Sequence, residues 1–156
     1  MPVATSDAAE YLDRCHAAIR ALYDYWDQKR GGRRMPARSD IDPTEFVAHL
    51  PGIMLVDVVA DERRYVYRLV GTREVEARGQ DPTGHAVGEK FHGSSRENVL
   101  SNYDRVCRER RPLFDDYHFT SPGGRLLDEQ AIFLPLSADG ETVNQILVYT
   151  DHRRLP

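Results

Sequence analysis

The sequence predicts an α+β domain built on a five-stranded antiparallel sheet, with helices on one face and a long helix in front. Three observations predict this class. Short β-type segments occur near residues 53–70 and 113–150, a helical pattern fills the stretch between them, and nearly every connection is short. With 156 residues, 40% of them apolar, the chain has enough apolar surface for one core. Because each element has a single apolar face to bury, the helical block must lie against the sheet.

The N-terminal helix is predicted over residues 7–30, with Ser6 or Asp7 as N-cap and Gly31 and Gly32 after its end. Its apolar side chains form a narrow seam with spacings of 4, 3, 4, 3 and 4 residues: Ala8, Leu12, Cys15, Ile19, Leu22 and Trp26. A narrow seam is typical of a helix with one partner surface. That surface is either the chain's own sheet or the same helix of a second subunit. In the second case the dimer interface consists of Leu12, Cys15, Ile19, Leu22 and Trp26.

Residues 31–52 read as a linker followed by a short helix. Turn formers and charges dominate the linker, and we expect five charged residues to hold it on the domain body or on a partner: Arg33, Arg34, Arg38, Asp40 and Asp42. Asp42 also suits the N-cap of a helix over residues 44–50, which Pro51 and Gly52 end.

The remaining elements follow in order. The predicted strands share alternating apolar residues and turn formers at their ends, and cover residues 53–59, 65–70, 113–120, 126–136 and 143–150. Between the second and third strands we expect short helical turns near 72–77 and 87–91, then a helix over 94–110 that Pro112 ends. The chain thus divides into an N-terminal helix (1–30), a linker with a short helix (31–52), the core (53–151) and a tail (152–156).

Composition and charge exclude several classes. The balance of 21 basic against 25 acidic residues gives a net charge of −4, which disfavours nucleic-acid binding despite the cations between Lys29 and Arg38. No apolar run is long enough for a membrane helix and no signal peptide is visible, so we expect a cytoplasmic protein without membrane contact. Cys15 and Cys107 have neither disulfide-scaffold nor metal-site spacing, so no metal site is predicted.

Three separated strings resemble PAS domains, in particular the short stand-alone bacterial PAS proteins first catalogued as a domain of unknown function. The first is the stretch 33–43 with Leu50-Pro51 after it. The second joins residues 67–72, Tyr-Arg-Leu-Val-Gly-Thr, to residues 79–84, Gly-Gln-Asp-Pro-Thr-Gly, and the third joins 134–137, Leu-Pro-Leu-Ser, to Asp139-Gly140. The resemblance spans residues 18–150 and implies a five-stranded sheet used as a sensory or interaction module.

The resemblance leaves the cofactor open and disfavours two. The light-sensing flavin branch carries an Asn-Cys-Arg-Phe string in the helical block, whereas residues 87–96 contain no cysteine, so we do not expect a light-reactive cysteinyl flavin. Haem is not expected either, because His92 alone is insufficient to indicate a haem site.

A ligand would lie between the helical block and the sheet. The candidates to line that space are Tyr67, Leu69, Arg73, Phe91, His92, Val99, Tyr103, Phe133, Leu134, Ile146 and Val148. Each of these residues can also have a purely structural role instead of contacting a ligand. Most of the apolar ones are core residues in any case, and Arg73 can pair with a nearby carboxylate such as Glu74 rather than with a ligand.

These observations favour a non-enzymatic PAS sensory or adaptor module that acts through protein–protein interaction. We expect a homodimer, a separate signalling protein as partner and, in the pocket, a small-molecule ligand; a purely interacting module with a filled core is the variant without one. The alternative is a small lyase or isomerase with Asp57 or Asp116 as acid/base carboxylate. The chain contains no GxSxG, HExxH or P-loop motif. The ligand, the signal and the partner are not determined by the sequence.

Overall fold

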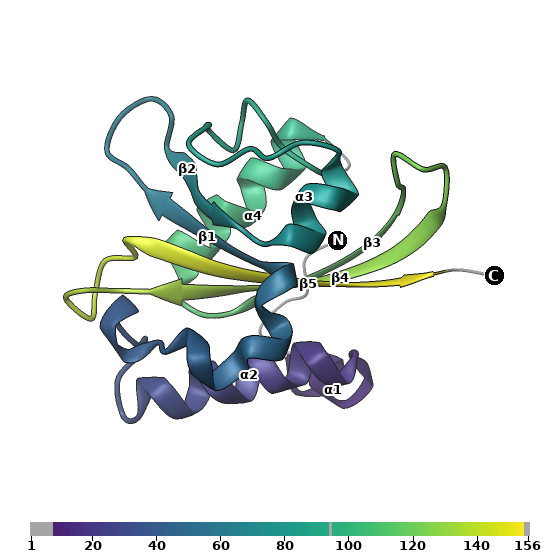
Figure 1. Ribbon diagram of the computed structural model, residues 1–156. Coiled ribbons are helices and arrows are strands. Elements are labelled where there is room, and N and C mark those ends of the chain that lie inside the picture. Colours follow the sequence, from purple (N-terminus) through teal and green to yellow (C-terminus); the bar gives the residue numbers. More distant parts are fainter. Residues whose placement is uncertain (1–7, 94, 155–156) are drawn as a thin grey trace.

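A computed structural model of the chain describes residues 8–93 and 95–154. The predicted caps Ser6 and Asp7 and the end of the tail, residues 155–156, lie outside this range. The five predicted strands form one antiparallel sheet in the order β2-β1-β5-β4-β3 (Figure 1). Their bounds are β1 Ile53–Val58, β2 Tyr65–Val70, β3 Leu113–Thr120, β4 Leu126–Leu136 and β5 Gln145–Arg154. The α+β fold class is therefore confirmed.

Helices cover both faces of the sheet (Figure 1). The predicted helical block, with α3 (Thr72–Arg78) and α4 (Arg96–Glu109), lies on one face. The N-terminal helices α1 (Ala8–Arg14) and α2 (Ala17–Arg30) lie on the other. Because both faces of the central strands are buried, β1 is apolar from Ile53 to Val56 and β5 from Ile146 to Tyr149.

The single N-terminal helix predicted from the periodicity is two helices, and the break falls at His16. Its backbone is extended, with φ −59° and ψ 144°. Its N–H donates to Gln130 Oε1 at 2.8 Å, and its ring Nδ1 lies 2.7 Å from Asp151 Oδ2. These hydrogen bonds to the sheet form at the point where the helix is interrupted. The sequence pattern could not predict the interruption, because both partners lie more than 100 residues away in the chain.

The apolar seam packs on the chain's own sheet. Ile19, Leu22 and Trp26 are buried, and the Trp26 indole N–H donates to the Pro135 carbonyl at 2.9 Å. Of the two possibilities, the structure adopts docking within the chain. The chain's own sheet thus covers these three side chains, while Leu12 and Cys15 are half-buried at the edge of the same cluster.

The linker is held mainly by its own residues. Asp40 accepts a hydrogen bond from the Ala37 N–H and pairs with Arg33 at 2.9 Å, and Arg38 donates to the Ile41 carbonyl. Asp42 accepts from the Thr44 N–H, as its predicted capping role requires. Arg34 lines a surface hollow beside α2. The following short helix is the 3-10 helix η3 (Pro43–Gly52), which is interrupted at Phe46.

A β-bulge separates two side chains that the alternation placed together. Leu55 pairs with Leu69, but the next residue, Val56, pairs with Tyr67, so Arg68 is an extra residue in β2. Because strand side chains alternate faces, one extra residue moves the following side chain to the opposite face. Tyr67 therefore points toward α4, and Leu69 lies half-exposed on the face of the N-terminal helices.

The boundaries of α4 and β5 differ from the prediction. Helix α4 begins at Arg96 with Ser95 as N-cap, whose hydroxyl accepts from the Asn98 N–H, and the predicted first residue, Ser94, lies outside the described residues. Strand β5 continues to Arg154, so residues 152–154 of the predicted tail belong to the sheet. Among the described residues no helix is both long and apolar enough to cross a bilayer.

Candidate functional site

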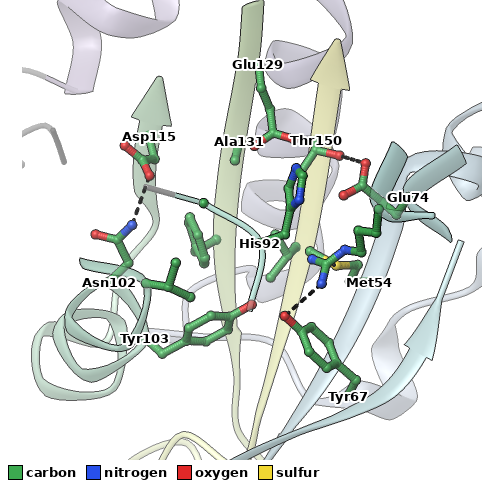
Figure 2. Close-up of a pocket in the computed structure, with 15 residues that line it drawn as sticks. Met54, Tyr67, Glu74, His92, Asn102, Tyr103, Asp115, Glu129, Ala131 and Thr150 are labelled. Atoms are coloured by element: carbon green, nitrogen blue, oxygen red, sulfur yellow. Dashed lines mark hydrogen bonds between the residues drawn. The ribbon is translucent and has the colours of Figure 1, made fainter. Parts of the chain in front are cut away.

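A cavity of about 40 Å³ lies between the sheet and the helical block, where a ligand pocket was predicted (Figure 2). Six predicted lining residues surround it: Tyr67, His92, Val99, Tyr103, Phe133 and Val148. Nine further residues complete the wall: Met54, Glu74, Arg78, Gly93, Asn102, Asp115, Glu129, Ala131 and Thr150. The cavity is thus lined by charged side chains as well as by apolar and aromatic ones.

The other predicted lining residues lie elsewhere. Leu69 is on the opposite face because of the bulge, and Phe91 is 39% exposed. Ile146 and Leu134 are fully buried core residues away from the cavity wall. Arg73 lies at the surface, where its guanidinium donates to the Thr150 carbonyl and covers the Tyr149 ring.

The charged residues of the wall were not predicted, because their positions depend on strand register and on one short helix. Glu129 is the register partner of His152, and Ala131 and Phe133, on the same face of β4, pair with Thr150 and Val148 of β5. The alternation of β4 was a signal for Glu129, since it places a carboxylate in line with Ala131 and Phe133. No such signal existed for Glu74 and Arg78, which reach the cavity from α3.

Arg78 is held against one wall by three partners. Its Nη1 donates to the Tyr67 hydroxyl at 3.0 Å and to the Lys90 carbonyl at 3.2 Å, and its Nη2 lies 3.1 Å from Met54 Sδ. The guanidinium also lies 4.9 Å from the centre of the Tyr67 ring, within the range of a cation–π interaction. Its Nε–H is buried and has no hydrogen-bond partner among the described residues.

Tyr103 places a hydroxyl in the cavity (Figure 2). The residue is 2% exposed, and its ring packs edge-on against Phe133 at 5.2 Å. No hydrogen bond to this hydroxyl is found within the part of the chain that the structure describes. Burial raises the pKa of Tyr103 well above its ordinary value, so the group stays protonated and available as a donor.

Two further groups define the polar side of the wall. Asn102 donates to Asp115 Oδ2 at 2.9 Å, which fixes both side chains at the junction of α4 and β3 (Figure 2). His92 enters from the loop before α4, and burial lowers its pKa, which favours the neutral imidazole.

At one end of the cavity Glu74 and Glu129 lie on either side of His152. The His152 Nε2 is 2.6 Å from Glu129 Oε1 and 3.3 Å from Glu74 Oε2, and the Thr150 hydroxyl donates to Glu74. Burial, and then the charge of Glu129, raise the pKa of Glu74. Burial opposes the charged form of His152, but its hydrogen bond to Glu129 and the charge of Glu74 outweigh this and raise its pKa.

The carboxylates named for an enzymatic alternative are not at the cavity. Asp57 accepts from Gln145 Nε2 at 2.8 Å and lies 3.5 Å from Arg68. Asp116 is exposed. The structure therefore does not support an acid/base role for either residue in this cavity.

Residues 14–149 match the PAS domain family, so the chain belongs to that family. Solved structures share its fold. The LOV protein of Rhodobacter sphaeroides is 12% identical, with a TM-score of 0.51 over 72% of this chain and 68% of that one. A sensory box sensor histidine kinase from Vibrio cholerae is 16% identical, with a TM-score of 0.51 over 72% of this chain and 90% of that one. Comparison with curated proteins finds no match.

A third structure, of a light-oxygen-voltage domain studied with a flavin analogue, is 9% identical, with a TM-score of 0.50 over 72% of this chain and 83% of that one. At this identity the likeness shows the fold alone. The chain thus has the fold of a PAS sensory domain, and its cofactor is open.

Proposed function

We propose that this chain is a non-enzymatic PAS sensory module that binds a small polar ligand in the cavity between the sheet and α4. The bound ligand carries at least one hydrogen-bond acceptor, and the signal passes to a partner signalling protein. The observation that carries the proposal is the Tyr103 hydroxyl, a buried donor that enters the cavity and has no hydrogen bond among the described residues.

Energetics support an acceptor in this place. An unpaired buried donor costs about 1 to 3 kcal/mol, and the cavity wall holds one, the Arg78 Nε–H. The Tyr103 hydroxyl, which has no hydrogen bond among the described residues, is a second donor on the same wall. A carboxylate, carbonyl or hydroxyl oxygen in the cavity can accept from such donors. Because the donors come from α4 and α3, a ligand that bonds to both would connect the two helices of the block.

Size supports a small ligand rather than a flavin. A pocket for a drug-sized molecule typically has about 300 to 1,000 Å³. The 40 Å³ cavity does not fit an isoalloxazine ring with Arg78 and Tyr103 in their present places. Neither Cys15 nor Cys107 lines it, which agrees with our proposal that no light-reactive cysteinyl flavin forms. The same size argument applies to haem.

The homodimer expected from the sequence remains part of the proposal, but its contact surface is not the α2 seam. The α2 seam is buried on the sheet and cannot pack on a second subunit at the same time. Light scattering tests the subunit count. A monomer at all protein concentrations would remove the dimer from the proposal and leave the partner signalling protein.

Ligand binding is tested by native mass spectrometry on protein purified without denaturant, followed by thermal unfolding with formate, acetate, glycolate and glycerol. We expect a bound small molecule, or a rise in Tm with at least one of these probes. Tyr103→Phe, which removes only the hydroxyl, should reduce that rise.

Tyr11→Phe is the matched control, because the Tyr11 hydroxyl is also buried without a partner among the described residues but lies on the other face of the sheet, against Phe114. This variant should leave the rise unchanged. Absence of any bound molecule and of any rise in Tm, or an equal loss in both variants, would contradict the proposed ligand.

A further inference from the structure

Glu74, Glu129 and His152 form a buried cluster at the end of the cavity. Glu129 and His152 face each other across β4 and β5, and Glu74 reaches them from α3. One ligand atom from each of the three lies within 4.8 Å of the others. The two glutamates are 1% and 3% exposed, and the His152 side chain is 8% exposed. Three elements thus bring three metal-ligating side chains to one point.

Two buried carboxylates share one imidazole in this cluster. Burying a carboxylate is costly unless a cation or a proton compensates its charge. His152 supplies at most one positive charge for two glutamates. A divalent cation with two glutamates and a neutral imidazole gives a net charge of zero.

The neighbouring arginines Arg73 and Arg78 do not compensate the carboxylate charge through hydrogen bonds to Glu74 or Glu129. The guanidinium of Arg78 donates to Tyr67 and the Lys90 carbonyl, and that of Arg73 donates to the Thr150 carbonyl. Within the described chain, neither has a hydrogen bond to Glu74 or Glu129. Hydrogen bonds from these two arginines therefore do not compensate the charge of the two carboxylates.

The spacing is also close to what a metal requires. With metal–ligand bonds of about 2.0 to 2.2 Å, neighbouring ligand atoms lie about 2.8 to 3.6 Å apart at octahedral to tetrahedral angles. The His152 Nε2 to Glu74 Oε2 distance of 3.3 Å is within this range. The distance of 2.6 Å to Glu129 Oε1 would have to increase by a few tenths of an ångström, a shift that a glutamate rotamer can supply.

We propose that Glu74, Glu129 and His152 bind one divalent transition-metal ion, with a further coordination position open to the cavity. One imidazole and two carboxylates suit Zn²⁺, Mn²⁺ or Fe²⁺ better than Mg²⁺, which prefers an all-oxygen octahedron. A second observation points to an occupant on that open side. The cavity that Glu74 and Glu129 line is also lined by Arg78, whose buried Nε–H has no hydrogen-bond partner among the described residues and can donate to an acceptor such as a metal-bound water. The proposal does not depend on the organic ligand proposed above.

The test uses the full chain, stripped with a chelator and then dialysed. Isothermal titration with ZnCl₂ should give one site per chain with micromolar or tighter affinity, and MgCl₂ should give no binding at the same concentration. Co²⁺ serves as a spectroscopic probe, because its visible absorption reports nitrogen and oxygen coordination. No heat with Zn²⁺ and no Co²⁺ spectrum would overturn the proposal and identify the cluster as a proton-sharing hydrogen-bond network.

Glu129→Gln and His152→Gln should each weaken Zn²⁺ binding at least tenfold and change the Co²⁺ spectrum. The matched control is His85→Gln, since His85 forms an exposed pair with Glu89 at 3.4 Å and belongs to no group of three metal-ligating side chains among the described residues. It should leave the affinity unchanged. Equal affinity in Glu129→Gln and wild type, or loss in His85→Gln alone, would refute the assignment.

Circular dichroism in EDTA checks that the variants fold. If His152→Gln does not fold, the near-isosteric Glu129→Gln decides the question. Tyr103→Phe separates the two proposals, because it should weaken the organic probe and leave Zn²⁺ affinity within twofold. If no organic ligand binds in the cavity, the Zn²⁺ titration still tests the metal site.

Discussion

Leu22→Ala tests whether the N-terminal helix stabilises the domain by docking on its own sheet. Leu22 is 1% exposed at the centre of the α2 seam. Truncating a leucine in such a place typically costs about 2 to 5 kcal/mol, because apolar contact is lost and the surroundings fill the space only in part. That is a large fraction of the roughly 5 to 15 kcal/mol by which a domain is stable. We expect the free energy of unfolding in urea to fall by an amount in this range.

The same experiment separates docking within the chain from dimerisation. If the seam is buried within one chain, the unfolding midpoint of the wild type is independent of protein concentration. If it were buried between two chains, each tenfold dilution would lower the apparent stability by about 1.4 kcal/mol. Gln28→Ala, at an exposed position of α2, is the control and should change stability by no more than about 0.5 kcal/mol. An unchanged free energy in Leu22→Ala, or a midpoint that moves with concentration, would refute the reasoning.

Two further predictions concern the segment that leads into the sheet and the turn after β2. Gly71→Ala should destabilise the protein by about 1 to 3 kcal/mol in urea unfolding, because its Cβ would lie 2.4 Å from the backbone oxygens of Leu50 and Pro51. Gly32→Ala, with open space around it, should change stability by less than 1 kcal/mol, and an equal loss in both variants would contradict this argument. Burial lowers the pKa of His49, so the unfolded state binds the extra proton first and stability falls as pH drops below the unfolded value of about 6.5. His49→Phe keeps the ring and should flatten the pH dependence of Tm between pH 6.5 and 5; a slope equal to that of the wild type would show that another group causes it.

The sequence determined the order and type of the elements. Alternating apolar residues, turn formers and helix caps act within about ten residues of each other, so all five strands, α4 and the capping role of Asp42 could be located locally. The strings that resemble PAS domains identified the family, and the position of the cavity followed from the need to bury the helical block on the sheet.

The tertiary structure decided which side chains meet. The break at His16 depends on Gln130 and Asp151, partners in distant strands that compete with the local helix. The bulge at Arg68 reverses the face of Leu69, and periodicity alone contains no information about an extra residue. A seam of apolar residues likewise has the same pattern whether its partner is the chain's own sheet or another copy.

The cluster of Glu74, Glu129 and His152 illustrates the same limit at the candidate site. These residues are far apart in the sequence and lack motif spacing, and only the register of β4 against β5 and the approach of α3 bring them together. Local propensity acts between neighbours, whereas the chemistry of this site depends on contacts that form only when the sheet and the helical block pack. The sequence alone therefore defined the family and the fold, and the packed structure defined the site.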